Sequence, residues 1–140
     1  MSKLTKIFCG VIILTIPTIQ YGGYFLLQNL SGNYDQLNLT EFQESMFRAG
    51  HAHAGVLVIL SLIAQALIDH SSLNKSFEWL ARIGFPLAAI LVSGGFFSSA
   101  IGSSVSEPNN LIVILYAGII VLFFSLLILG VGLLKAAKNS

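Results

Sequence analysis

The sequence predicts an all-α integral membrane protein, an up-down bundle of four transmembrane helices, on three observations. The 140 residues are 55% hydrophobic and only 9% charged, with a mean hydropathy of +0.83, whereas a soluble domain carries about a quarter charged residues. Four apolar stretches are each long enough to cross a hydrocarbon core of about 30 Å, which needs roughly 20 helical residues. The connections between them are short, which makes consecutive helices antiparallel.

The four helices are expected in one domain that covers the whole chain, residues 1–140. They are predicted near residues 4–28, 44–68, 82–104 and 110–134. The first is interpreted as a retained helix because no small-x-small cleavage pattern follows it. Thr40 and Gln43 have the spacing of a capping box, so the second helix begins ahead of the membrane. A turn over 31–35 precedes it, and Pro108 is expected in the first turn of the fourth helix, where its missing N–H does no harm.

The charged residues predict the orientation of the helices. The first and third loops carry Asp35, Glu41 and Glu107 and no basic residue. The N-terminus, the second loop and the C-terminus hold the basic residues Lys3, Lys6, Lys75, Arg82, Lys135 and Lys138. The positive-inside rule then predicts a multi-pass protein of the cell (inner) membrane with both termini in the cytoplasm. Arg48 is the one exception, at the outer end of the second helix.

Composition also limits the partners of the chain. The net charge of +1 offers no basic patch for nucleic acid. The single cysteine, Cys9, excludes an internal disulfide framework and is read as a buried, inert thiol. The lipid bilayer is the partner that the apolar helices require, and a homo-oligomer is left open.

Polar residues follow one face of the second helix. At 100° per residue, Glu44, Arg48 and His51 share a sector, whereas His53 points about 200° away from His51. The two histidines therefore cannot chelate one ion from a regular helix, and His53 faces the third helix or another protomer. An ionisable group inside a membrane span is a site hypothesis by default.

Other polar residues gather in the same, extracytoplasmic half of the membrane. They predict a polar pocket bounded by the first, second and fourth helices, with Arg48 and His51 at its centre. Its candidate ligand-binding residues are Arg48, His51, Glu44, Gln20, Tyr21, Tyr24, Asn109 and Tyr116. Structural alternatives stay open: Arg48 pairs with Glu44 or Glu41, His51 bonds a tyrosine, and Asp69 and His70 form an inner-surface helix end.

Small residues recur every four positions on the third helix, in the rows Gly94–Ser98–Gly102 and Gly95–Ser99–Ser103. Such rows let helix backbones approach closely, so this helix is expected to be the packing spine. Pro17 and Pro86 each deprive the carbonyl four residues earlier of its partner, which favours a kink.

The run FRAGHAHAGVLVIL over 47–60 resembles a family of small four-helix bacterial integral membrane proteins. The resemblance extends to IPTIQYGGYFLL over 16–27 and LARIGFPLAAILVSGGFF over 80–97, and it implies the fold without implying an activity. More distantly, the His-x-His resembles the haem-ligating helices of haem–copper oxidases, in which two histidines on opposite faces serve two sites. The further histidines of a binuclear centre are missing, so oxygen reduction is not implied.

Three functions follow as hypotheses. The first is a module that binds a small polar or amphipathic ligand, such as a quinone or a lipid head group, around Arg48 and His51. The second is a redox protein with haem b or copper on His51, or on His51 and His53 as metal ligands. The third is a structural or accessory subunit without a ligand. Covalent enzyme chemistry is not predicted, because no catalytic cysteine or serine motif occurs.

Overall fold

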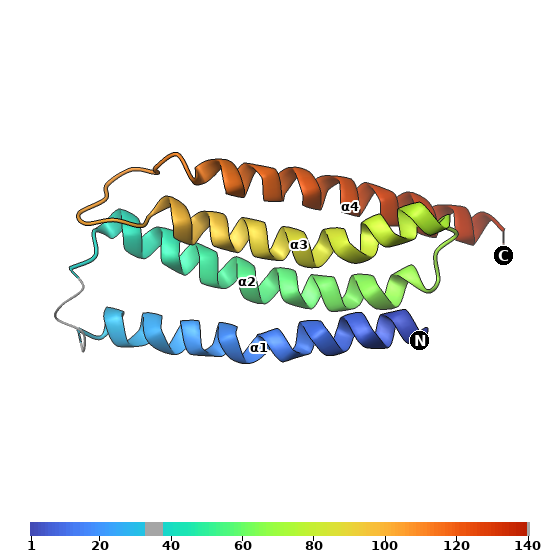
Figure 1. The fold of residues 1–140 in the computed structure, drawn as a ribbon, viewed down its shortest axis with the longest axis horizontal. Helices are drawn as coiled ribbons and strands as arrows, with labels where there is room; N and C mark the ends of the chain where they lie inside the picture. Colours follow the sequence, from blue (N-terminus) through green and yellow to red (C-terminus); the bar gives the residue numbers. More distant parts are fainter. Residues whose placement is uncertain (33–37, 140) are drawn as a thin grey trace.

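The structure, a computed structural model, describes residues 1–32 and 38–139, and these residues form four long antiparallel helices (Figure 1). The helices are α1 (Lys3–Leu30), α2 (Glu41–Ile68), α3 (Lys75–Ser99) and α4 (Ile112–Lys138). Each is long and apolar enough to cross a membrane. The chain is therefore a multi-pass membrane protein in contact with the bilayer, and the all-α, up-down prediction is confirmed. The turn predicted over 31–35 extends into 33–37, outside the described residues.

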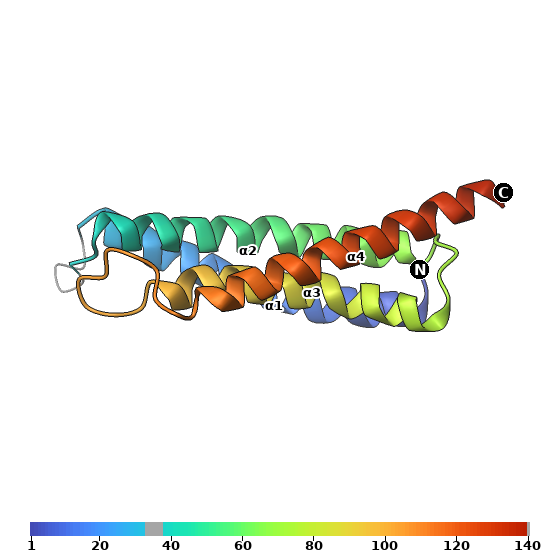
Figure 2. The ribbon, with the colours of Figure 1, turned by 90° about the horizontal axis from the view of Figure 1, so that it is seen from above.

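Helix α3 lies at the centre of the bundle. It packs against α2 on one side and α4 on the other, whereas α1 packs mainly against α2. Helices α1 and α4 thus lie on opposite sides of the α2–α3 pair (Figure 1), and Figure 2 shows α4 crossing α3 obliquely. Both termini and the α2–α3 loop lie at one end, which we call the basic end because it carries Lys3, Lys6, Lys75, Lys135 and Lys138.

The start of α2 confirms the predicted capping box. The Thr40 hydroxyl accepts a hydrogen bond from the Gln43 backbone N–H, and the Gln43 side-chain oxygen accepts one from the Thr40 N–H, both at 3.1 Å. The Gln43 side chain is buried, and its amide Nε2 donates to the carbonyl oxygens of Ala100 and Gly102, each at 2.9 Å. The cap therefore also fastens the start of α2 to the end of α3.

Helix α3 begins earlier than the predicted 82. The Asn74 side chain caps its first turn by accepting a hydrogen bond from the Phe77 N–H at 3.0 Å, so the helix starts at Lys75. It ends at Ser99 rather than near 104. Placing Arg82 in the loop with the lysines was therefore wrong, because it lies about 10 Å inside α3 at 1.5 Å per residue.

Helix α4 begins at Ile112, so the prediction of Pro108 in its first turn was wrong. The segment before α4 is held against the end of α3 by Asn109. Its backbone N–H donates to the Ser99 carbonyl at 2.9 Å, and its side-chain Nδ2 donates to the Ser98 carbonyl at 3.0 Å. Helical geometry starts only after these bonds, and Pro108 lies in the loop.

Helices α3 and α4 approach each other through glycines. A Cβ on Gly95 would lie 2.4 Å from the Leu115 backbone nitrogen, and one on Gly118 would lie 2.7 Å from the Val92 nitrogen. The expectation that α3 is the packing spine is confirmed for the row containing Gly95. Gly94 in the other row has nothing within 4 Å of its Cβ position.

The neighbouring glycines Gly95 and Gly94 provide a matched test of this contact. We expect Gly95→Ala to lower the free energy of unfolding by about 1–3 kcal/mol, because the methyl group forces the two backbones apart. Gly94→Ala faces open space and should leave stability unchanged or raise it by up to about 1 kcal/mol, the helix-propensity difference. Thermal unfolding in detergent micelles measures both, and equal effects would contradict the packing described here.

Candidate functional site

A buried polar network lies near the basic end and joins three helices. We call it the Arg82 cluster, and it consists of Ser2, Thr5, Gln65, Asp69, Glu78 and Arg82. The Arg82 side chain is only 1% exposed and makes four hydrogen bonds. Nε donates to Glu78 at 2.9 Å and Nη2 to Asp69 at 2.8 Å, while Nη1 donates to Thr5 at 2.9 Å and to Gln65 at 3.1 Å.

The acidic partner Asp69 is itself held from α1. The Thr5 hydroxyl donates to its Oδ1 at 2.6 Å, and the Ser2 backbone N–H donates to its Oδ2 at 2.7 Å. Desolvation raises the pKa of Asp69, but the hydrogen bonds from Thr5, Ser2 and Arg82 outweigh it and hold that pKa well below its usual value. Asp69 therefore stays ionised, and its stabilising effect is lost only as the pH falls through this lowered pKa.

Pro86 explains why Gln65 belongs to the cluster. A proline has no N–H, so the carbonyl of Arg82, four residues earlier, has no helical partner. The Gln65 amide Nε2 donates to that carbonyl at 2.8 Å, while its Oε1 accepts from the Arg82 side chain. One fully buried glutamine thus serves both the backbone and the side chain of Arg82. A carbonyl left unpaired in lipid costs several kcal/mol, so this bond fastens α2 to α3.

Sequence reasoning missed this cluster, although its signals are present. Gln65 and Asp69 lie one helical turn apart at the end of an apolar stretch, and Glu78 precedes Arg82 by the same interval. Pro86 follows Arg82 by four residues and so marks the free carbonyl. From the sequence, Arg82 was placed with the lysines of the second loop, Pro86 was interpreted as a kink, and Asp69 was assigned to an inner-surface helix end. Together they specify a buried arginine with partners on both sides.

His51 lies between α2 and α1 at the other end of the molecule. A Cβ on Gly23 would lie 2.9 Å from both Cε1 and Nε2 of the imidazole, and one on Gly22 would lie 3.8 Å from Nδ1. The ring therefore occupies the space that a side chain at position 23 would fill. Glycine at this position allows α1 to approach α2.

His53 points to a different neighbour, as predicted. Its ring lies 4.8 Å from the ring of Phe96 on α3, and its Nδ1 is 2.7 Å from the Ala49 carbonyl oxygen. The two histidines of the motif thus contact α1 and α3 separately. Within residues 1–32 and 38–139, no group of three or more His, Cys, Asp or Glu side chains is placed to hold a metal. Haem b or copper on His51 stays a prediction.

The other predicted pocket residues are dispersed. Arg48 pairs with Glu44 at 2.9 Å, but its side chain is 57% exposed, so the pair resembles a surface ion pair. Asn109 is occupied in the α3–α4 loop. Four residues lie exposed, Gln20, Tyr21 and Tyr24 on α1 and Tyr116 on α4. Since α1 and α4 lie on opposite sides of the bundle, the structure does not bring these residues together.

A groove of about 330 Å³ lies between α1, α2 and α3, near the middle of these helices. We call it the α1 groove. Its lining is apolar apart from hydroxyl groups and comprises Val11, Ile12, Thr15, Thr18, Ile19, Ala54, Val58, Ser61, Pro86, Ala89, Ile90 and Ser93. The volume lies at the lower end of the range of small-molecule sites, roughly 300–1,000 Å³.

The hydroxyl groups of this groove are not equivalent. Thr15, Thr18 and Ser61 each donate to a carbonyl of their own helix, at 2.6–2.7 Å. The Ser93 side chain is on a residue only 7% exposed, and its Oγ has no hydrogen-bond partner among the described residues. A serine in a helix ordinarily donates to a carbonyl three or four residues earlier, as Ser99 does. Ser93 is therefore the hydroxyl that can bond a ligand.

Comparisons with family models, with curated proteins and with solved structures gave no match to the chain. The candidate site is the apolar α1 groove with its Ser93 hydroxyl, and it lies between the two attachments of α1, the Arg82 cluster and the His51 ring on Gly23.

A substitution of Asp69 tests whether the Arg82 cluster stabilises the bundle. We expect Asp69→Asn to lower the free energy of unfolding by about 3 kcal/mol, because it leaves a buried guanidinium with one charged partner fewer. Glu44→Gln removes a partner from the exposed ion pair and should cost under about 1 kcal/mol. Unfolding in mixed micelles can be followed by the fluorescence of Trp79, which contacts Phe8 of α1 with ring centroids 6.0 Å apart.

Adding Arg82→Met and Glu78→Gln to Asp69→Asn should recover much of the loss, since Glu78 is the other charged partner of Arg82 and the triple variant has no charged group left in the cluster. A triple variant less stable than Asp69→Asn alone would contradict the electrostatic explanation.

Gly23 tests the contact of His51 with α1. We expect Gly23→Leu to lower the free energy of unfolding by about 1–3 kcal/mol, because the side chain competes with the imidazole for the same space. Gly10→Leu is the control on the same helix, since nothing lies within 4 Å of that Cβ position. Thermal unfolding of the two purified variants measures both effects. Equal losses of stability in Gly23→Leu and Gly10→Leu would refute the contact.

Proposed function

We propose that the protein binds a small amphipathic molecule from the bilayer in the α1 groove, with Ser93 as its hydrogen-bonding anchor. The observation that carries the proposal is the unpaired Ser93 hydroxyl, buried in the wall of an otherwise apolar groove. An unsatisfied buried polar group costs about 1–3 kcal/mol, and a ligand carbonyl or hydroxyl would remove that cost.

The positions of the neighbouring polar residues support a definite direction for the ligand. Gly50 of α2 contacts Phe96 of α3, so Ser93 is level with Ala54, one turn along each antiparallel helix. His51 lies less than one turn beyond Ala54, and Arg48 follows towards the end opposite the basic end. The polar part of the ligand would therefore lie near Ser93 and His51, with its apolar part directed towards Pro86.

This arrangement supports a quinone head group or the ester region of a lipid as the ligand chemistry. The proposed site keeps His51 and Arg48 of the predicted pocket as groups just beyond the end of the groove that is farther from the basic end. In place of Tyr116 and Asn109, it uses Ser93. The positive-inside rule predicts that both termini are in the cytoplasm and that the end of the groove near His51 faces the extracytoplasmic side.

A short-chain quinone tests the proposal. We expect decylubiquinone to raise the unfolding temperature of the detergent-purified protein, and Ser93→Ala to weaken its apparent affinity about five- to tenfold, the effect of one hydrogen bond. Ser98→Ala is the matched control, because that hydroxyl lies outside the groove lining on the same helix and bonds the Gly95 carbonyl.

Without ligand, Ser93→Ala should be as stable as the original protein or more so, since it removes an unpaired hydroxyl. The alternative of an accessory subunit without a ligand requires Ser93→Ala and Ser98→Ala to behave alike with and without the quinone. That outcome would refute binding at Ser93.

A further inference from the structure

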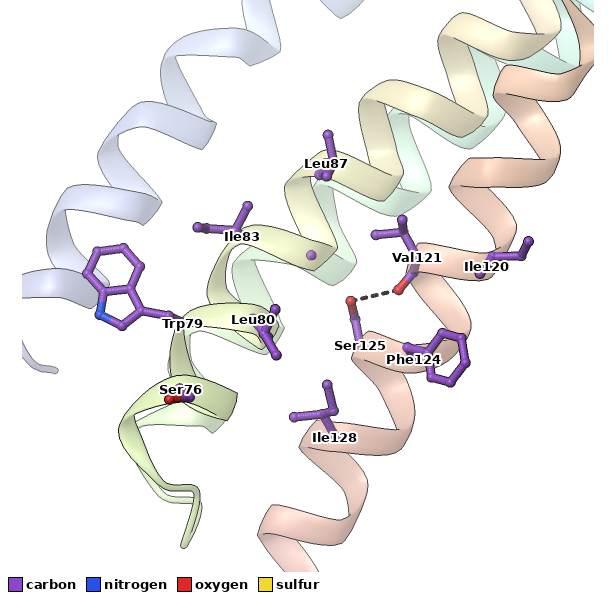
Figure 3. A pocket seen from close by; sticks show the side chains of 11 residues that line it. Ser76, Trp79, Leu80, Ile83, Leu87, Ile120, Val121, Phe124, Ser125 and Ile128 are labelled. Atoms are coloured by element: carbon purple, nitrogen blue, oxygen red, sulfur yellow. Dashed lines mark hydrogen bonds between the residues drawn. The ribbon is translucent and has the colours of Figure 1, made fainter.

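A second and larger groove lies between α3 and α4, in the half of the molecule nearer the basic end (Figure 3). It encloses about 770 Å³ and is lined by Ser76, Trp79, Leu80, Ile83, Gly84, Leu87, Ile120, Val121, Phe124, Ser125 and Ile128. The Ser125 hydroxyl already donates to the Val121 carbonyl at 2.8 Å, as the dashed line in Figure 3 marks. The wall therefore offers a ligand hydrocarbon contact rather than hydrogen bonds.

The shape of this groove follows from one close contact. A Cβ on Gly84 would lie 2.0 Å from the Ser125 Oγ, so the two helices touch where both residues are small. Larger apolar side chains line the groove on either side of this contact, among them Ile83 and Leu87 on α3 and Val121 and Phe124 on α4 (Figure 3). The hollow is therefore a built feature of the α3–α4 interface.

The groove continues towards the basic end. An adjoining hollow of about 290 Å³ shares Ile128 with it and is lined by Leu73, Phe77, Leu127, Val131 and Lys135 as well. From Ile120 to Lys135, the combined groove runs about 22 Å along α4 at 1.5 Å per residue. This length matches the thickness of one leaflet, which is half of a hydrocarbon core about 30 Å thick plus its interfacial region.

Unpaired positive charge surrounds the end of the combined groove. Lys75, Lys135 and Lys138 are exposed, and none of them takes part in an ion pair within the described part of the chain. The acidic side chains Asp69 and Glu78 of this end are both occupied by Arg82. The mouth of the groove therefore presents uncompensated ammonium groups and the Ser76 hydroxyl at the membrane interface.

We propose that this groove is a binding site for an anionic phospholipid, with an acyl chain between α3 and α4 and the phosphate near Lys75 and Lys135. The apolar wall accounts for the chain, the length of the groove matches one leaflet, and the lysines select a negative head group. Each lysine near an anionic membrane surface contributes a preference of about fivefold. The site shares no lining residue with the α1 groove and does not depend on the function proposed there.

Trp79, the only tryptophan of the chain, lies at the edge of the groove with its indole directed towards α1 (Figure 3), and because it is 39% exposed it reports the lipid beside the groove. The protein is reconstituted in mixed vesicles of phosphatidylglycerol and phosphatidylcholine in which one lipid at a time carries brominated acyl chains. We expect brominated phosphatidylglycerol to quench Trp79 more strongly than the same mole fraction of brominated phosphatidylcholine. Each of Lys75→Gln and Lys135→Gln should lower the deduced preference about fivefold, and the triple variant that also carries Lys138→Gln should remove it.

Two controls separate this site from ordinary lipid contact. In Trp79→Phe combined with Val113→Trp, the reporter lies at the other end of α4, where both lipids should quench equally. Ile83→Phe narrows the groove and should reduce the preference, whereas Ile119→Phe, equally exposed but outside the groove lining, should not.

Equal quenching of Trp79 by the two lipids would overturn the proposal, as would a preference that survives the triple lysine variant. Protection of Trp79 from both lipids, together with a dimer mass in native mass spectrometry, would show instead that a second copy of the chain covers the groove.

Discussion

The position of α1 depends on the partners that a buried guanidinium requires. Arg82 is fully enclosed, and its hydrogen-bonding groups are satisfied only when Thr5 of α1 and Gln65 and Asp69 at the end of α2 converge on it. Apolar helix faces do not select one another inside a bilayer, since lipid tails are as apolar as leucine. Polar contacts that lipid cannot replace therefore decide where α1 attaches. The same contacts explain why α1 follows α2 closely although little of its surface is buried.

Helices α1 and α4 join the bundle by different means. Helix α4 lies against α3 at glycine positions, and a backbone hydrogen bond of 3.0 Å from Ser72 to the Gly132 carbonyl fixes its last turns to the α2–α3 loop. Such contact extends along the helix because small residues recur. Helix α1 is fastened at two places instead, by the Arg82 cluster and by His51 on Gly23. The groove lies between these two attachments because the middle of α1 makes no comparable contact with α3.

The sequence was sufficient to predict the four helices, but it was insufficient to predict which helices pack against one another. Hydropathy and span length gave the four helices, the Thr40–Gln43 spacing gave one boundary, and helical periodicity separated His51 from His53. The start of α3 was missed because Asn74 caps a turn that is less apolar than the span itself, and Arg82 was misplaced with it. The predicted pocket required α1 beside α4. Short loops make consecutive helices antiparallel, but they do not decide which helices close the bundle; Gly95 and Gly118 decide it by bringing α4 onto α3.

The two attachments of α1 also limit how a ligand would reach the proposed site. Towards the basic end, the Arg82 cluster joins α1, α2 and α3, and its ionic groups would have to lose their partners before a ligand could pass between these helices. Towards the other end, the imidazole of His51 fills the space above Gly23. A lateral path between α1 and α3, at the middle of these helices, would avoid both attachments and would lead from the hydrocarbon of the bilayer. A charged or strongly hydrated solute would have to lose its water in the bilayer before entering, at a cost that one serine hydroxyl cannot repay. The geometry therefore favours a molecule that already resides in the membrane and carries one or two hydrogen-bonding groups.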